Sequence, residues 1–186
     1  MPSANEPTAA EVIAATRTWL ERAVIGLNLC PFAKSVHVRN QIRYVVSEAR
    51  TEDALLAELR TELNHLQSVS AEEVETTLLI HPWVFADFLE FNAFHDPAEA
   101  LLEELQLVGE IQIASFHPAF QFAGTEPDDI TNCTNRSPYP TLHLLREASI
   151  ERALESFPRP ESIYEANQET LRRLGREGWE RLAFKP

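Results

Sequence analysis

Residues 42–80, IRYVVSEARTEDALLAELRTELNHLQSVSAEEVETTLLI, decide the fold class, because they read as strand, helix and strand. β-Branched and aromatic residues fill 42–47 (IRYVVS), as is typical of a strand. Thr51 is placed to cap the following helix, whose apolar stripe recurs at helical spacing through Leu55, Leu59, Leu63 and Leu66. A second strand follows at 76–80 (TTLLI), and His81-Pro82 stops it. This alternation favours parallel strands joined by helical crossovers.

The flanking sequence extends the same alternation. A capping box of Thr8 and Glu11 begins a first helix, and 111–116 (IQIASF) reads as a third strand. Further helices are expected over 83–94, from an N-cap at Asp96, from Pro140 onward, and from about Glu161 to Gly175. Hairpin strands are a further possibility within 28–40. We therefore expect one small α/β domain spanning 1–186, with about three strands alternating with helices packed on the sheet, and a flexible tail at 1–7.

Composition narrows the classes of partner. The 186 residues fit one domain, and 16 basic against 29 acidic residues, a net charge of -13, argue against binding to nucleic acid. No apolar run approaches the roughly 20 residues of a membrane helix, and residues 1–12 lack the pattern of a secretory signal. Cys30 and Cys133 suggest no disulfide framework. These features predict a cytoplasmic protein whose partner is a small molecule, and they leave its oligomeric state open.

A polar segment, 116–147, is the expected functional site. His117 directly follows the third strand and His81 the second, and the carboxyl ends of parallel strands share one edge, where ligands of α/β sheets bind. Imidazoles transfer protons near neutral pH, so the catalytic candidates are His117 and His143, with Asp128 to orient an imidazole. Asp128 and Asp129 also fit the first turn of a helix that Thr125 would cap.

Arg136 is the strongest single candidate for binding an anion, because a guanidinium holds a phosphate or carboxylate through two hydrogen bonds. A salt bridge from Arg136 to Asp128 or Asp129 is the competing interpretation. The other candidates for ligand binding are polar neighbours, of which the amides and the serine are also common turn residues. The full set is Arg136, Asn132, Asn135, Ser137, Tyr139 and Arg146.

No sequence motif identifies a cofactor, and a divalent metal is the one that the side chains could bind. The sequence has neither HExxH nor CxxC, so a divalent metal would need ligands from distant positions, namely His81, His117, His143, Cys30 and Asp128. Cys30 is either a nucleophile beside a histidine or a buried inert thiol. Gly124 is the only glycine between Gly109 and Gly175. This spacing excludes a phosphate loop and a dinucleotide fingerprint.

Three motifs carry a resemblance to a known family: LNLCPFAK (27–34), HPWVFADFLEFN (81–92) and FHPAFQFAGTEPDDITNCTNRSPYPTLHLLREAS (116–149). On these the chain resembles the bacterial domain-of-unknown-function family 1415, whose members have about this length. The resemblance implies no reaction and no catalytic assignment. It places these residues in the motifs that define the family: Cys30, His81, His117, Asp128, Asp129, Asn132, Asn135, Arg136 and His143.

Three functions remain. The first is a cytoplasmic enzyme, hydrolase- or transferase-like, that holds a small anionic metabolite with Arg136 and uses histidine acid/base or metal chemistry. The second is a ligand-binding or regulatory module without chemistry. The third is a protein-interaction domain whose docking surface is formed by Trp83, Phe85, Phe88 and Phe91.

Overall fold

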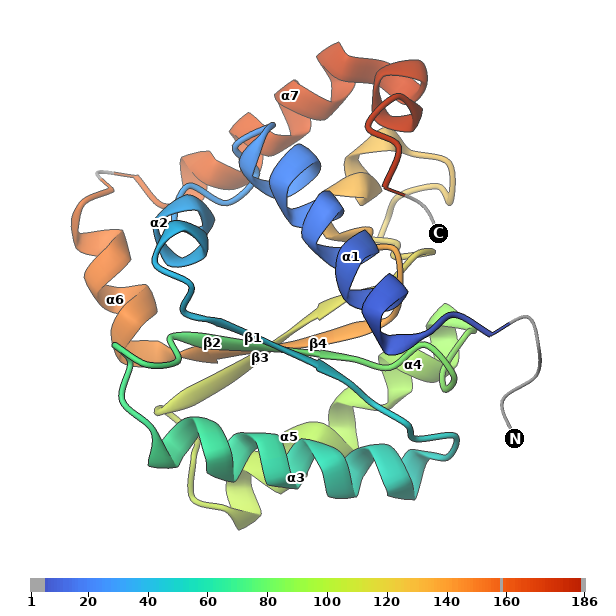
Figure 1. Cartoon of the computed structure of the whole chain (residues 1–186). Coiled ribbons are helices and arrows are strands. Elements are labelled where there is room, and N and C mark those ends of the chain that lie inside the picture. Colours follow the sequence, from blue (N-terminus) through green and yellow to red (C-terminus); the bar gives the residue numbers. More distant parts are fainter. Residues whose placement is uncertain (1–5, 158, 185–186) are drawn as a thin grey trace.

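Four strands form one mixed sheet in the computed structural model, which describes residues 6–157 and 159–184 (Figure 1). The strands are β1 (Ile42–Val46), β2 (Thr76–Ile80), β3 (Ile111–Phe116) and β4 (Thr141–Arg146), in the order β1-β2-β4-β3. β1 pairs parallel with β2, and β4 pairs antiparallel with both β2 and β3. β1, β2 and β3 therefore run in one direction, which confirms the α/β class with four strands rather than three.

The fourth strand corrects the helix expected from Pro140. The spacing of Leu142 and Leu145 fits a helix, but in the structure the segment is a strand whose side chains alternate between the two faces of the sheet. Leu142 and Leu144, two residues apart, lie on the same face and are both buried. β4 lies between β2 and β3, so apolar residues are needed on both of its faces. The helix α6 (Glu147–Glu155) begins only after the strand ends.

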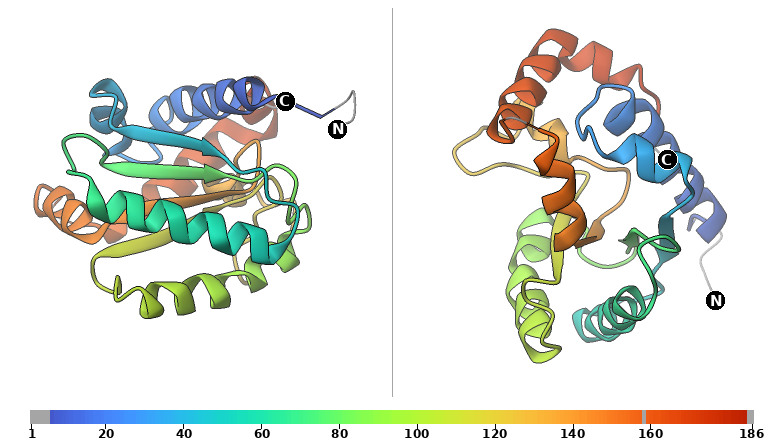
Figure 2. Two further views of the ribbon diagram at one scale, coloured as in Figure 1. Left: turned by 60° about the horizontal axis from the view of Figure 1, so that its bottom comes forward. Right: turned by 90° about the vertical axis from the view of Figure 1, so that its left-hand side faces the viewer.

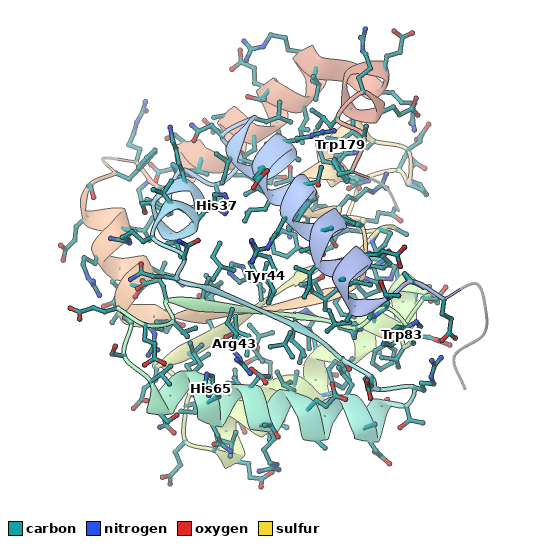
Figure 3. The ribbon with its side chains drawn as sticks, viewed as in Figure 1. His37, Arg43, Tyr44, His65, Trp83 and Trp179 are labelled. Atoms are coloured by element: carbon teal, nitrogen blue, oxygen red, sulfur yellow. The ribbon has the colours of Figure 1, made fainter. Side chains whose placement is uncertain are left out.

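Helices cover both faces of the sheet (Figures 1 and 2). One face carries α3 (Glu52–Ser68), α4 (Phe88–Ala93) and α5 (His95–Glu104). The other carries α1 (Ala9–Trp19), the π-helix η1 (Leu20–Ile25), α2 (Ala33–Val38), α6 and α7 (Glu161–Glu180). Neighbouring strand residues alternate between these faces, so Arg43 points towards α3 and Tyr44 towards α1 (Figure 3).

Each face has its own apolar core. Leu79, Ile113 and Leu144 pack with the stripe of α3 and with α5. On the opposite face, Leu78 and Ile80 pack with Val12 of α1, and Trp19 packs with α7. Burial of these side chains at about 25 cal/mol per Å² of apolar surface stabilises the two layers against the sheet.

Several helix boundaries differ from expectation. The helix expected over 83–94 is confined to α4, because Asp87 caps it by accepting hydrogen bonds from the backbone N–H groups of Leu89 and Glu90. α5 begins at His95, so Asp96 lies inside its first turn and is not its cap. Residues 33–38 form α2, where hairpin strands were considered.

Gly175 interrupts the last helix, as its expected role as a terminator suggested, but the chain resumes a helix beyond it. Its φ of 66° and ψ of 175° break α7, which continues to Glu180. Of the tail expected at 1–7, residues 1–5 lie outside the described residues, while Glu6 forms an ion pair with Arg50. Of the helices in the described ranges, none combines the length and apolar character that a membrane span requires.

Candidate functional site

His81 and His117 emerge at the same edge of the sheet, where β2 and β3 end. The strands are not neighbours, because β4 lies between them. The ring of Phe91 separates the imidazoles, with its centroid 5.3 Å from that of His81 and 5.3 Å from that of His117. The two histidines therefore share an aromatic cluster without forming a catalytic pair.

The backbone uses both ring nitrogens of His117. Nδ1 accepts a hydrogen bond from the N–H of Ala119 at 3.0 Å, so Nε2 carries the proton and donates it to the carbonyl of Phe85, also at 3.0 Å. Burial lowers the pKa of His117 and favours this neutral tautomer. No lone pair is left for a substrate, and the ring holds the turn before α4 against the loop after β3.

His81 is fully buried. Its Nδ1 donates to the carbonyl of Val84 at 3.2 Å, while its Nε2 is buried and has no hydrogen-bond partner among the described residues. Burial lowers the pKa of His81 to about 4, so the imidazole is neutral at physiological pH.

His143 has a different geometry, on the opposite face of the sheet. Its Nε2 lies 2.8 Å from the hydroxyl of Thr76, and that hydroxyl lies 2.5 Å from the carbonyl of Leu144. A threonine hydroxyl has one proton, and the carbonyl can only accept, so Thr76 donates to Leu144 and accepts from His143 Nε2–H. Nδ1 of His143 is therefore an unprotonated acceptor, and it has no hydrogen-bond partner in the described part of the chain.

Most polar side chains of 116–147 hold the loop itself together. The Oδ1 of Asn132 accepts from the N–H of Phe122 and the hydroxyl of Thr125, and its Nδ2 donates to the carbonyl of Glu126. Asp129 caps the 3-10 helix η2 (Ile130–Asn135), where a helix capped by Thr125 was expected. Asn132 thus meets its hydrogen-bonding needs within the loop.

Three further candidates also bond to the backbone or the core. Asn135 donates to the carbonyl of Ser115, and Ser137 donates to the carbonyl of Tyr139. The ring of Tyr139 packs against Val12 and its neighbours on the sheet, and burial raises the pKa of its phenol. The structure places none of the three towards the free acceptor of His143.

The two predicted arginines lie at opposite ends of β4. Arg136 donates to the carbonyls of Phe120 and Pro127, and within the described residues it forms no ion pair with Asp128 or Asp129. Arg146 donates instead to three carbonyls at the carboxyl end of α3 and beyond it, those of Leu66, Val69 and Val74. The two guanidinium groups therefore do not converge on one ligand.

The metal and nucleophile candidates are also dispersed. Within residues 6–157 and 159–184, no three His, Cys, Asp or Glu side chains gather in a way that would hold a metal ion. The thiol of Cys30 accepts hydrogen bonds from the backbone N–H groups of Phe32 and Ala33, yet burial dominates and raises its pKa. Cys30 is therefore a protonated thiol at neutral pH.

The aromatics of the interaction hypothesis pack among themselves. Phe91 is buried, and Trp83, Phe85 and Phe88 are partly buried. Phe88 contacts the rings of His117 and Phe120. None of these four side chains is exposed.

A cavity of about 300 Å³ on the face that bears α2 and α6 does bring predicted residues together. We call it the sheet-face pocket. η1 and α2 line one side, α6 lines the other, and the sheet forms its floor. Its floor and apolar walls include Trp19, Ile42, Leu78, Phe116, Leu145 and Ile150. His143, Thr76 and Cys30 supply polar groups, so the pocket combines an apolar lining with few polar atoms, as ligand sites do.

Basic side chains also line the sheet-face pocket. Arg39, Arg146 and Arg152 contribute to its lining, against a single acid, Glu75. This local excess of positive charge contrasts with the net charge of -13 of the chain. The hydroxyl oxygen of Ser149, also in the lining, is buried and finds no hydrogen-bond partner in residues 6–157 and 159–184.

The interpretation from the sequence alone included His143 but missed most of this pocket. Its walls come from segments that read as ordinary core, such as Trp19, Leu78 and Ile150. One signal was present: in a strand over 141–146, His143 faces away from Leu142 and Leu144, and so projects from the other face of the sheet.

Comparison with known proteins identifies a family and nothing further. The profile of the family described as "Protein of unknown function (DUF1415)" matches residues 11–181. The comparisons with curated proteins and with solved structures return no match.

Proposed function

The chain belongs to the DUF1415 family, and from the sheet-face pocket we propose that it is an enzyme for a small amphipathic anion, with His143 as proton acceptor. The proposal rests on one observation. The hydrogen bonds of Thr76 assign the Nε2–H tautomer to His143 and leave Nδ1 as a free lone pair in a ring that lines the cavity. His81 and His117 lack this combination.

The lining supports the class of substrate. At about 300 Å³ the pocket lies at the small end of ligand sites, and its walls suit an aliphatic or aromatic body. Arg39 directly follows α2 and Arg152 lies on α6; both are exposed, and neither forms an ion pair within the described residues. A carboxylate at the mouth of the pocket would be held by these guanidinium groups while the apolar body lies over the sheet.

The chemistry follows from the ring. Nδ1 takes a proton from the bound molecule, whose electron pair stays on the atom that loses it. The imidazolium that forms keeps its Nε2–H donor on Thr76. Burial lowers the pKa of His143 to about 4, and the negative charge of the substrate stabilises the imidazolium. The proposal therefore requires an anionic substrate.

Binding without chemistry is the second candidate function. It is favoured by the raised pKa of Cys30, which supplies no thiolate, and by the low basicity of an imidazole buried in an apolar wall. In that function Nδ1 accepts a hydrogen bond from a donor group of the ligand and takes no proton from it.

Ligand-detected NMR with straight-chain and aryl carboxylic acids of about six to ten carbon atoms tests the pocket. Ala153 lines it from α6, so Ala153→Phe is expected to weaken binding at least about tenfold by filling the space. Ala148, on the same helix, is exposed and outside the lining, so Ala148→Phe is the matched control. Equal affinity in the two variants would place the acids elsewhere.

The corresponding primary amides test the charge. The acids are expected to bind more tightly than the amides, and Arg39→Gln combined with Arg152→Gln is expected to remove that preference. A preference for amides, or one that survives both substitutions, would contradict the anionic substrate.

A further inference from the structure

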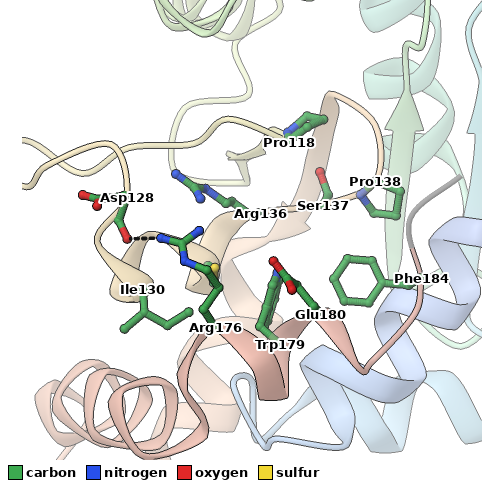
Figure 4. A pocket seen from close by; sticks show the side chains of 11 residues that line it. Pro118, Asp128, Ile130, Arg136, Ser137, Pro138, Arg176, Trp179, Glu180 and Phe184 are labelled. Atoms are coloured by element: carbon green, nitrogen blue, oxygen red, sulfur yellow. Dashed lines mark hydrogen bonds between the residues drawn. The ribbon is translucent and has the colours of Figure 1, made fainter.

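A second cavity, about 420 Å³ in volume, lies between the loop after β3 and α7 (Figure 4). Two arginines line it, Arg136 at the end of η2 and Arg176 directly after the break at Gly175. The sheet-face pocket shares none of these residues. We call it the two-arginine pocket.

The loop holds both guanidinium groups through consecutive carbonyls. Arg136 Nη2 donates to the carbonyl of Pro127 at 2.6 Å, and Arg176 Nη2 donates to that of Asp128 at 3.0 Å. Arg136 Nε adds a bond to the carbonyl of Phe120 at 3.1 Å. Figure 4 shows the two groups on the same side of the pocket beside residue 128. Each is therefore positioned by neutral backbone and not by a counterion.

Neither arginine has an acidic partner, although acids outnumber basic residues by 29 to 16 in this chain. Within the described residues neither arginine forms an ion pair. The carboxylates of Asp128 and Glu180 line the same pocket but lie too far from both guanidinium groups to form one. Two like charges held on adjacent carbonyls repel one another. An anion between the two guanidinium groups offsets that repulsion.

The unused donors define what such an anion must be. A guanidinium has five N–H groups, and the bonds above use two of Arg136 and one of Arg176. The remaining donors suit an anion with several oxygens that can bind two forks at once, which a phosphate provides and a single carboxylate does not.

We propose that the two-arginine pocket is an oxyanion site for inorganic phosphate or the phosphate group of a small metabolite, distinct from the sheet-face pocket. The phosphate lies between Arg136 and Arg176 and receives hydrogen bonds from both. Trp179 and Phe184, both buried, also line the pocket and offer an apolar wall to the rest of a phosphorylated molecule. Free phosphate and a phosphate monoester differ only in whether that wall contributes.

Calorimetric titration of the full chain with inorganic phosphate, phenyl phosphate and acetate, at constant ionic strength, tests this site. Phosphate is expected to bind and acetate to bind far more weakly. Arg176→Gln is the main variant, because Arg176 makes a single exposed hydrogen bond and its loss spares the loop. It is expected to lower phosphate affinity at least about tenfold.

Arg136→Gln is expected to have the same effect, and circular dichroism shows whether that loop variant remains folded. Arg173→Gln, an exposed arginine on the same helix outside this pocket, is the control and is expected to retain affinity. Tighter binding of phenyl phosphate identifies a monoester as the ligand. Failure of wild type to bind either phosphate, or unchanged affinity in Arg176→Gln, would overturn the site, whatever the outcome for the sheet-face pocket.

Discussion

Acidification from about pH 7 to about pH 5 is expected to lower the free energy of unfolding by about 4 kcal/mol through two histidines alone. Burial lowers the pKa of both His81 and His143 from 6.5 to about 4 in the folded chain. In the unfolded chain each regains its ordinary pKa and takes up a proton below about pH 6.5. Their contribution to the free energy of unfolding is therefore highest above about pH 6.5. It decreases as the pH falls towards 4, and by pH 5 each histidine has lowered the free energy of unfolding by about 2 kcal/mol.

Urea denaturation across this range, stopping before most carboxylates titrate, measures the effect. His143→Gln removes one titrating group and is expected to reduce the pH-dependent loss by about half. Its stability at neutral pH sets the reference for that comparison. Equal free energies of unfolding at both ends of the range, or a variant with the wild-type slope, would contradict a neutral buried imidazole at position 143.

Removal of the proton acceptor is expected to have the second large effect. For acids that bind the sheet-face pocket, exchange for deuterium of the C–H proton next to the carboxylate, measured in D₂O, is expected to fall by about 10²–10⁴-fold in His143→Gln, the usual contribution of a general base. Glutamine keeps most of the volume of the ring but has no basic nitrogen. Binding of the acids should therefore change far less than the rate.

Thr76→Val tests the role of the hydroxyl separately. Thr76 orients the ring through Nε2, so its loss is expected to slow exchange while His143 remains present. Exchange at the wild-type rate in His143→Gln would exclude this residue as the base. A wild-type protein that binds the acids and exchanges none of their protons would favour the binding function without chemistry.

Local patterns were sufficient for the first three strands. The β-branched and leucine-rich runs at Ile42–Val46, Thr76–Ile80 and Ile111–Phe116 are each bounded by polar or turn residues, so their positions follow from the chain itself. β4 could not be recognised in this way. Its leucines satisfy helical and strand spacing together, and only its insertion between β2 and β3 decides between them.

The functional residues likewise divide into those that a local pattern indicates and those that only the folded chain brings together. The shared edge of His81 and His117 follows from strand direction, but the hydrogen bonds of their rings to the carbonyls of Val84 and Phe85 do not, because those carbonyls belong to an irregular turn. Asn132 reads as a turn residue, and its three hydrogen bonds within the loop agree with that interpretation. The pairing of Arg136 with Arg176 joins residues 40 positions apart across a helix break, which no local pattern indicates.

The state of one imidazole tests the central claim most directly. A long-range ¹H–¹⁵N NMR spectrum of the full chain, with His143 assigned by comparison with His143→Gln, reports which ring nitrogen carries the proton. We predict a neutral ring protonated at Nε2 near pH 7. We also predict that the Nδ1 resonance shifts when one of the straight-chain or aryl carboxylic acids binds. A ring protonated at Nδ1, or a Nδ1 resonance that does not respond to a bound acid, would contradict His143 as the proton acceptor of the sheet-face pocket.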